Sequence, residues 1–365
     1  MTDHLYMARA IELAWRGRYS THPNPRVGCV IVKDGVIVGE GFHVRAGEGH
    51  AEVHALKMAG ANAKGATAYV TLEPCSHHGR TPPCAEALVK AGVARVVAAM
   101  TDPNPQVAGR GLQRLKEAGI SVAHGVLEAE ARALNKGFLK RMEKGLPYVR
   151  VKLAMSLDGR TAMQSGESQW ITGPAARQMV QRLRAEASAI ITGADTVLTD
   201  QARLTVRADE LGLAGEALGL ATERAPLRVL IDGRRRVPLT APFFSAPNVL
   251  VASAVEDTEV TKAGHKLWRS TGEKVDLTAL LKKLADDGVN EVLVEAGAAL
   301  AGAFAALGLV DEYLIFMAPK LMGSSARALL DLPINQMCDA HTVQIQDIRA
   351  VGDDWLITAC ATPLA

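Results

Sequence analysis

The chain has 365 residues, of which 48% are hydrophobic and 22% charged, so its length predicts two or three globular domains. Its net charge is +2 and only 4% of its residues are aromatic. Nucleic-acid-binding proteins usually combine a basic excess with stacking aromatics, so this composition favours a small-molecule substrate. No apolar run is long enough to span a bilayer and the N-terminus is not typical of a signal sequence, so the cytoplasm is the expected location.

The first half predicts alternating helices and strands. Residues 3–17 read as an amphipathic helix, with apolar side chains at helical spacing: Leu5, Ala8, Ile11 and Trp15. Asp34-Gly35 is a hairpin signal between strands at 27–32 and 36–38, and Cys29 is expected in the core. Further helices are expected at 50–59, 83–91, up to 118 and 127–141, and further strands at 68–72, 94–100 and shortly after 118. The alternation predicts a largely parallel sheet with helices on both faces.

The stretch from His50 to Cys84 carries the first chemical signal. One imidazole and two thiols, from His50, Cys75 and Cys84, suit tetrahedral zinc with a fourth position left for water. Glu52 lies close enough in sequence to move a proton from that water to a leaving nitrogen. This order matches the signature of zinc nucleobase deaminases, except that eight residues separate the two cysteines where the signature has two.

Two other interpretations of these residues stay open. The zinc site could be closed and structural, with His77 or His78 as the fourth ligand. A disulfide between Cys75 and Cys84 is less favoured, because five cysteines in 365 residues do not describe a secreted disulfide scaffold.

The pattern of strands and helices restarts after residues 144–147, which predicts one domain over 1–145 and another over 146–365. Glu295 ends a buried-type strand, where a carboxylate is expected to face a cleft, and small residues at 296–302 would let backbone amides approach phosphate. Residues 208–224 are expected to form a variable excursion without strands. The expected strands are 148–154, 189–193, 228–231, 248–252, 291–295, 311–317, 341–348 and 355–361, with helices at 174–187 and 276–286.

Over nearly its full length the chain resembles the bifunctional deaminase–reductase family of riboflavin biosynthesis. The resemblance rests on ordered motifs: HPNPRVG at 22–28, HAE at 50–52, EPCSHHGRTPPC at 73–84, KLAMSLDG at 152–159, GESQWIT at 166–172 and LTVR at 204–207. The family implies an N-terminal cytidine-deaminase-like three-layer α/β/α domain and a C-terminal α/β domain similar to dihydrofolate reductase. It also implies a small phosphorylated substrate, with neither nucleic acid nor membrane as a partner.

For the first domain, the resemblance implies deamination of 2,5-diamino-6-(ribosylamino)pyrimidin-4-one 5′-phosphate by zinc hydroxide. His50, Cys75 and Cys84 would bind the zinc and Glu52 would be the catalytic proton shuttle. The residues implied to line the substrate pocket are Asn24, His43, His77 and Arg80, with Arg80 near the phosphate.

For the second domain, the resemblance implies NADPH-dependent reduction of the ribosyl chain to ribityl, giving 5-amino-6-ribitylamino-uracil 5′-phosphate. The implied substrate contacts are Ser168, Arg184, Leu204, Arg207 and Glu295, with both arginines suited to phosphate. The implied NADPH contacts are Ala154, Trp170, Thr196, Asp200 and Gly297. No metal is expected there, because hydride transfer mainly needs orientation.

The chain departs from the family pattern on the NADPH side, at Asp195, Gln201, Ala202 and Ala296. Two rival hypotheses are a tRNA-type deaminase, which the weak charge disfavours, and a non-catalytic protein in which zinc only holds the fold. Reductase domains of this type often pair, so a homodimer or higher oligomer is expected.

Overall fold

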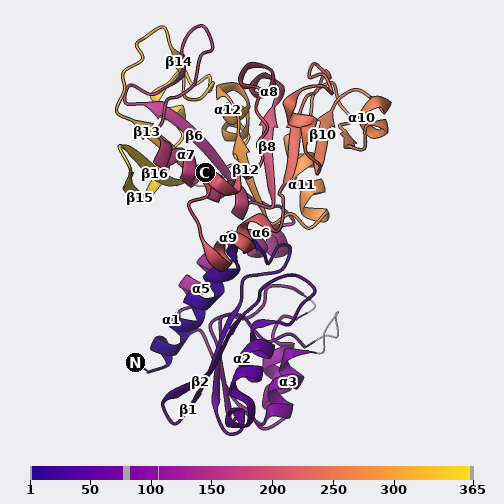
Figure 1. The fold of residues 1–365 in the computed structure, drawn as a ribbon, viewed down its shortest axis with the longest axis vertical. Coiled ribbons are helices and arrows are strands. Elements are labelled where there is room, and N and C mark those ends of the chain that lie inside the picture. Colours follow the sequence, from indigo (N-terminus) through magenta and orange to yellow (C-terminus); the bar gives the residue numbers. More distant parts are fainter. Residues whose placement is uncertain (1, 77–82, 106, 362–365) are drawn as a thin grey trace. The chain divides into compact units, whose positions relative to one another are not determined.

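The computed structural model describes residues 2–76, 83–105 and 107–361 and divides into two compact units, Met1–Leu146 and Pro147–Ala365 (Figure 1). Each unit has its own sheet and its own hydrophobic core. Among the described residues, no helix has both the length and the apolar character needed to cross a membrane.

Unit 1 contains a five-stranded sheet in the order β2-β1-β3-β4-β5. The strands are β1 Gly28–Lys33, β2 Val36–Phe42, β3 Thr67–Val70, β4 Arg95–Ala98 and β5 Ser121–His124. β1 runs antiparallel to β2 and β3, whereas the β3–β4 and β4–β5 pairs are parallel. The expectation of a largely parallel sheet is therefore wrong for this half, because the predicted hairpin enters the sheet beside β3.

The hairpin turn itself is confirmed. Asp34 and Gly35 both have positive φ, 51° and 78°, as a two-residue turn between antiparallel strands requires. Cys29 in β1 is fully buried, as predicted.

The sheet of unit 1 is covered on both faces (Figure 1). Helix α1 lies on one face with α5, and α2 and α3 lie on the other. The helices are α1 Thr2–Trp15, α2 Ala51–Ala59, α3 Cys84–Ala91, α4 Arg110–Glu117, α5 Glu128–Leu134 and α6 Lys136–Lys144, with 3-10 turns at Arg16–Tyr19 and Gly60–Ala63. Residues from α2, α3 and α4 share one core cluster with alternate residues of β1, β3 and β4.

Helix α2 approaches the sheet unusually closely. A Cβ on Gly39 would lie 2.2 Å from the carbonyl oxygen of Ala55, and one on Gly41 would lie 2.6 Å from that of Ala51. Only glycine fits at these two positions of β2, because any side chain would meet the helix backbone. This contact fixes where α2 begins, and α2 begins directly after His50.

Two predictions about the helices of unit 1 are wrong. The predicted apolar face of α1 is the outer one: Leu5 is 66% exposed and Trp15 40% exposed. The buried face is one position away, at Tyr6, Met7, Ala10, Leu13 and Ala14.

The single helix predicted over 127–141 is broken into α5 and α6 at Asn135. The Asn135 side chain accepts a hydrogen bond from the Arg26 backbone N–H at 2.8 Å and donates one to the Arg26 carbonyl at 2.9 Å. These hydrogen bonds hold Asn135 against the loop before β1. The tertiary contact therefore interrupts the helix that the sequence pattern predicts over 127–141.

Unit 2 contains a nine-stranded sheet in the order β11-β10-β9-β8-β12-β6-β13-β16-β15 and a small β14-β7 pair. The strands are β6 Tyr148–Ser156, β7 Arg160–Ala162, β8 Ala189–Gly193, β9 Leu227–Ile231, β10 Val249–Ser253, β11 Lys266–Arg269, β12 Glu291–Glu295, β13 Glu312–Ala318, β14 Arg327–Ala328, β15 Val343–Val351 and β16 Asp354–Ala361. In the large sheet, neighbours from β11 to β13 are parallel, and β16 is antiparallel to both β13 and β15.

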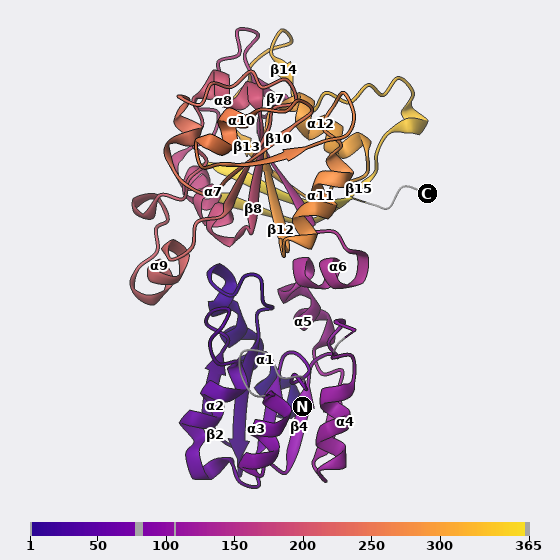
Figure 2. The same cartoon turned by 90° about the vertical axis from the view of Figure 1, so that its right-hand side faces the viewer.

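Helices cover this sheet on both sides. Figure 2 shows α7 on one side of the strands and α11 and α12 on the other. The helices are α7 Pro174–Glu186, α8 Ala194–Asp200, α9 Gly215–Thr222, α10 Thr258–Lys262, α11 Leu277–Asp286 and α12 Ala298–Ala306, with 3-10 turns at Ala208–Glu210, Pro242–Ser245 and Met337–Asp339. Residues 208–224 contain no strand, as predicted, but they form a 3-10 turn and α9.

The edge strand β15 exposes an apolar face. Val343, Ile345 and Ile348 are 43%, 56% and 53% exposed, and Trp355 on β16 is 46% exposed. A bulge after Ile345 shifts the register by one residue, so all three apolar side chains stay on one face of the sheet. Their cross-strand partners alternate along β16, namely Ala361, Ala359 and Ile357.

Candidate active sites

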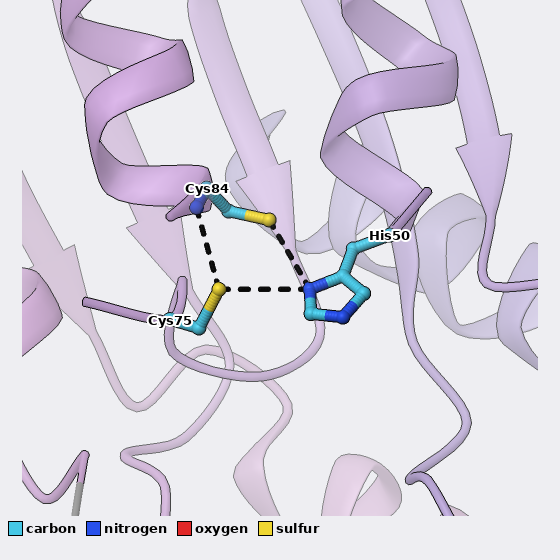
Figure 3. Close-up of side chains that lie close together, drawn as sticks. All are labelled: His50, Cys75 and Cys84. Atoms are coloured by element: carbon cyan, nitrogen blue, oxygen red, sulfur yellow. Dashed lines mark hydrogen bonds between the residues drawn. The ribbon is translucent and has the colours of Figure 1, made fainter. Parts of the chain in front are cut away.

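Three potential metal ligands meet in unit 1 (Figure 3). His50 Nδ1 lies 3.3 Å from Cys84 Sγ and 3.6 Å from Cys75 Sγ. Ligands of one tetrahedral zinc, with bond lengths near 2.3 Å to sulfur and 2.0–2.1 Å to nitrogen, would stand about 3.6 Å apart. The distances between the three side chains therefore fit a zinc site. All five cysteines are free thiols, so the alternative of a Cys75–Cys84 disulfide is not formed.

Each ligand lies at an element boundary. His50 directly precedes α2, Cys84 is the first residue of α3, and Cys75 follows β3 in the intervening loop. The Cys84 backbone N–H donates to Cys75 Sγ at 3.3 Å. Helix N-termini favour negative charge, so this position stabilises thiolates.

The electrostatics of the cluster favour metal binding. Hydrogen bonding from the Cys84 side chain, with a further contribution from His50, lowers the pKa of the Cys75 thiol. Hydrogen bonding to Cys75 and burial raise the pKa of the Cys84 thiol. A divalent cation would hold both cysteines as thiolates, because thiol ligands bind metal in their deprotonated form.

Glu52 lies beside this cluster in the first turn of α2. Its side chain is buried, and burial raises its pKa to about 7. Its Oε2 atom is buried without a hydrogen-bond partner among the described residues. A buried carboxylate oxygen left unsatisfied is costly for stability and indicates a place where a ligand or water belongs.

Asn24 and His43 form a polar pair next to the cluster. The Asn24 amide donates to His43 Nε2 at 3.0 Å, and His43 Nδ1 donates to the Gly49 carbonyl at 3.2 Å. Burial lowers the pKa of His43 to about 4, so the ring is neutral at physiological pH. The His43 ring also meets the His50 ring edge-on, with centroids 5.1 Å apart.

These groups line one cavity of about 590 Å³, a size typical of small-ligand sites. The cavity lies within unit 1 and is lined by residues from the Pro23–Pro25 loop, the cluster, the Asp102–Val107 segment and α6. Two Pro-Asn-Pro sequences, centred on Asn24 and Asn104, therefore reach the same cavity. His77, His78 and Arg80, which the sequence places near substrate or metal, lie outside the described residues.

Glu73 organises one wall of the cavity, and sequence reasoning assigned it no role. Its Oε2 accepts from the backbone N–H groups of Asp102 and Gly109 at 3.1 and 2.9 Å. Its Oε1 accepts from those of Gly111 and Leu112 at 2.8 and 3.2 Å. The carboxylate thus caps the N-terminus of α4 from the end of β3. A polar residue directly before Pro-Cys is the only signal the sequence offers.

In unit 2, charged side chains gather at the carboxyl end of β12 and the middle of β6. Arg184 on α7 binds Glu295 through two hydrogen bonds, Nε to Oε1 at 2.6 Å and Nη2 to Oε2 at 2.9 Å. Lys152 on β6 lies opposite Glu295 in the strand register. Ser168 Oγ donates to Asp200 Oδ1 at 3.1 Å, and the charges of both Glu295 and Asp200 act on Lys152.

Glu295 differs from its sequence expectation. Its side chain is buried, where an open cleft was expected, because Arg184 covers it. Burial alone would raise the pKa of Glu295, but the charge of Arg184 lowers it below the ordinary value.

Lys152 is the functional candidate that sequence reasoning missed in this unit. Burial lowers its pKa, and the charge of Arg184 adds to this effect, whereas Glu295 and Asp200 oppose it. The sequence signal for Lys152 was its place within the mainly apolar strand Tyr148–Ser156. Lysine is rarely buried in such a strand unless it has an anionic partner, so a buried lysine indicates a functional role.

The remaining positions expected to contact ligands also lie in unit 2. Leu204 is buried with φ of 53°, and Arg207 is exposed and pairs with Glu210 at 2.8 Å. Trp170 is 59% exposed, with the Arg177 guanidinium 4.8 Å from its ring centroid. The other positions lie on β6, on α8 and at the N-cap of α12, namely Ala154, Thr196 and Gly297.

Comparison with known proteins identifies both units. Residues 1–100 match the cytidine and deoxycytidylate deaminase zinc-binding region, and residues 147–357 match the RibD C-terminal domain. The chain belongs to the RibD family. It is 56% identical to the riboflavin biosynthesis protein RibD of Escherichia coli strain K12 over 97% of this chain and 98% of that protein. It is 48% identical to RibD of Haemophilus influenzae over 98% and 96%.

Solved structures agree with this assignment. Acinetobacter baumannii RibD (form 1) superposes with a TM-score of 0.93 at 50% identity, covering 99% of both chains. A diaminohydroxyphosphoribosylaminopyrimidine deaminase/5-amino-6-(5-phosphoribosylamino)uracil reductase from Thermotoga maritima superposes with a TM-score of 0.88 at 32% identity, also over 99% of both. This member of the family is thus a riboflavin biosynthesis enzyme with a zinc-dependent deaminase domain and an NADPH-dependent reductase domain, and both expectations are confirmed.

Replacing Glu73 tests its capping role. In Glu73→Gln one carboxylate oxygen becomes an NH₂ group that faces two N–H donors, so we expect a local loss of about 2–4 kcal/mol. Hydrogen-exchange mass spectrometry should show amides 109–112 exchanging at least 10-fold faster. Glu117→Gln, on the exposed end of the same helix, should leave them unchanged. Equal protection in both variants would contradict the capping role.

Proposed function

We propose that unit 1 removes the amino group from 2,5-diamino-6-(ribosylamino)pyrimidin-4-one 5′-phosphate, with water replacing ammonia at the ring carbon. His50, Cys75 and Cys84 would hold the zinc ion. Zinc, when bound, supplies a Lewis acid that lowers the pKa of a water molecule. The observation that carries the proposal is the buried, partnerless Oε2 of Glu52 beside a three-ligand cluster.

Within this site Glu52 moves the protons. A carboxyl group whose pKa is near 7 can take a proton from water and return it to the departing nitrogen at neutral pH. Asn24 and the neutral His43 would orient the pyrimidine by hydrogen bonds, since each is held in place by its partner. His77 and Arg80 remain proposed substrate contacts.

Unit 2 would then reduce the ribosyl chain to ribityl. NADPH, when bound, supplies the hydride, and a proton must arrive separately to balance the reaction. We assign the proton to Lys152, because its lowered pKa makes the ammonium a better acid. Glu295, held by Arg184, and Asp200, held by Ser168, would fix the lysine and the sugar hydroxyls.

The remaining assignments follow the family pattern. Arg207, exposed beside its ion pair, is the better-placed phosphate ligand of the two arginines, because Arg184 already uses two N–H groups on Glu295. Leu204 would contact the substrate. NADPH would contact Ala154, Trp170, Thr196, Asp200 and Gly297. Free thiols throughout agree with a reducing compartment such as the cytoplasm.

Glu52→Gln tests the deaminase mechanism. The variant should keep one zinc per chain by elemental analysis and lose ammonia release by a factor of about 10²–10⁴, because the proton carrier is gone. Glu86→Gln, an exposed carboxylate in the first turn of α3, should behave like the parent enzyme. A zinc-loaded Glu52→Gln enzyme with full turnover would show that the metal is only structural.

Lys152→Met tests the reductase assignment. Supplied with the deaminated intermediate, it should oxidise NADPH at least about 100-fold more slowly, with ammonia release from the diaminopyrimidine unchanged. The matched control is Lys282→Met, a surface lysine paired with Asp286. Undiminished NADPH oxidation in Lys152→Met would remove the lysine from the mechanism.

We further propose that the enzyme is a homodimer or higher oligomer that covers the exposed apolar face of β15 and β16. An edge strand with open backbone groups and a row of apolar side chains is ordinarily protected by a partner. Ile348→Lys should reduce the mass measured by light scattering toward one chain. Leu5→Lys, on the exposed face of α1, should not. An oligomer unaffected by Ile348→Lys would place the interface elsewhere.

A further inference from the structure

Arg141 reaches the deaminase cavity from α6, a helix with no assigned role. Phe138, Arg141 and Met142 line the cavity together, at the i, i+3 and i+4 spacing that puts side chains on one helical face. These residues lie outside the zinc-binding region that ends at residue 100.

The position of Arg141 is set by neighbouring groups. Its Nη2 donates to the Pro23 carbonyl at 3.4 Å, and its guanidinium carbon lies 6.0 Å from the Phe138 ring centroid. Asn135, at the start of α6, is bonded at both ends to the backbone of Arg26. The helix is thus tied to the same loop that supplies Asn24, so the guanidinium and the Asn24 amide are held on adjoining parts of the wall.

Arg141 is the permanent cation among the described residues that line the cavity. The two lining histidines are His50 of the metal cluster and His43, whose two ring nitrogens already face the Asn24 amide and the Gly49 carbonyl. Burial lowers the pKa of Arg141.

We propose that Arg141 binds the 5′-phosphate of the deaminase substrate and so selects phosphorylated over unphosphorylated pyrimidines. The inference rests on the proposed function of this site. Arginine suits the task because its planar N–H fork matches two phosphate oxygens. The substrate phosphate would occupy the part of the cavity formed by α6 and the Pro23–Pro25 loop, and the pyrimidine would lie toward the metal cluster.

The test compares two substrates across three enzymes. Ammonia release is measured with the diaminopyrimidine ribosyl phosphate and with the same compound lacking the phosphate, using the parent enzyme, Arg141→Met and Arg132→Met. Arg132 is the matched control because it pairs with Glu143 at 2.8 Å on the surface. Arg141→Met should lose about 100-fold in kcat/KM with the phosphorylated substrate and less than 3-fold without the phosphate. Arg132→Met should match the parent with both.

A second variant guards against misfolding. Arg141→Lys keeps the charge but loses the fork, so it should lose about 10-fold with the phosphorylated substrate alone. Zinc content and NADPH oxidation with the deaminated intermediate should be unchanged in all variants. Equal losses with both substrates, or no loss with either, would overturn the inference while leaving the deaminase assignment intact. If the parent enzyme released no ammonia from either substrate, the deaminase assignment and this inference would both be overturned.

Discussion

The deaminase site depends on the close approach of α2 to β2. Gly39 and Gly41 let the helix backbone rest directly on the strand, against Ala51 and Ala55. Because the helix cannot slide or lift without losing this contact, its first turn is fixed in position. His50 and Glu52 are therefore placed by packing, and the two cysteines from α3 and the loop after β3 meet His50 there.

The two buried carboxylates of unit 1 show how the fold separates structural from chemical tasks. Glu73 accepts four backbone N–H groups and is fully used in holding α4 and the 102–109 segment. Glu52 is equally buried but keeps an oxygen without a partner among the described residues. The oxygens of Glu73 are occupied by backbone donors, whereas the Oε2 atom of Glu52 can accept a hydrogen bond from a ligand or water.

Local sequence signals predicted much of this fold and of the metal cluster. The Asp34-Gly35 turn, the helix starts at 51 and 84 and most strands of both sheets are as expected, because turn chemistry and apolar periodicity act over a few residues. The failures involve distant partners. The inner face of α1 depends on which side meets the sheet, and the break at Asn135 depends on Arg26, more than a hundred residues away.

The same limit applies to the sites. His50, Cys75 and Cys84 belong to one short stretch of sequence, so their proximity could be predicted from the sequence alone. The burial of Glu295 requires knowing that α7 places Arg184 over the end of β12. The roles of Glu73 and Lys152 likewise come from groups that lie far from them in sequence.

Two different segments of the deaminase unit supply the metal cluster and the far wall of the cavity, and helix α6 belongs to the second. The segment that matches the cytidine and deoxycytidylate deaminase zinc-binding region ends at residue 100 and carries the candidate metal ligands and Glu52. The cavity is completed by Phe138, Arg141 and Met142, which follow that segment. Substitutions in α6 would therefore change the wall of the cavity without touching the metal cluster or Glu52. The cavity extends beyond the segment that matches the zinc-binding region.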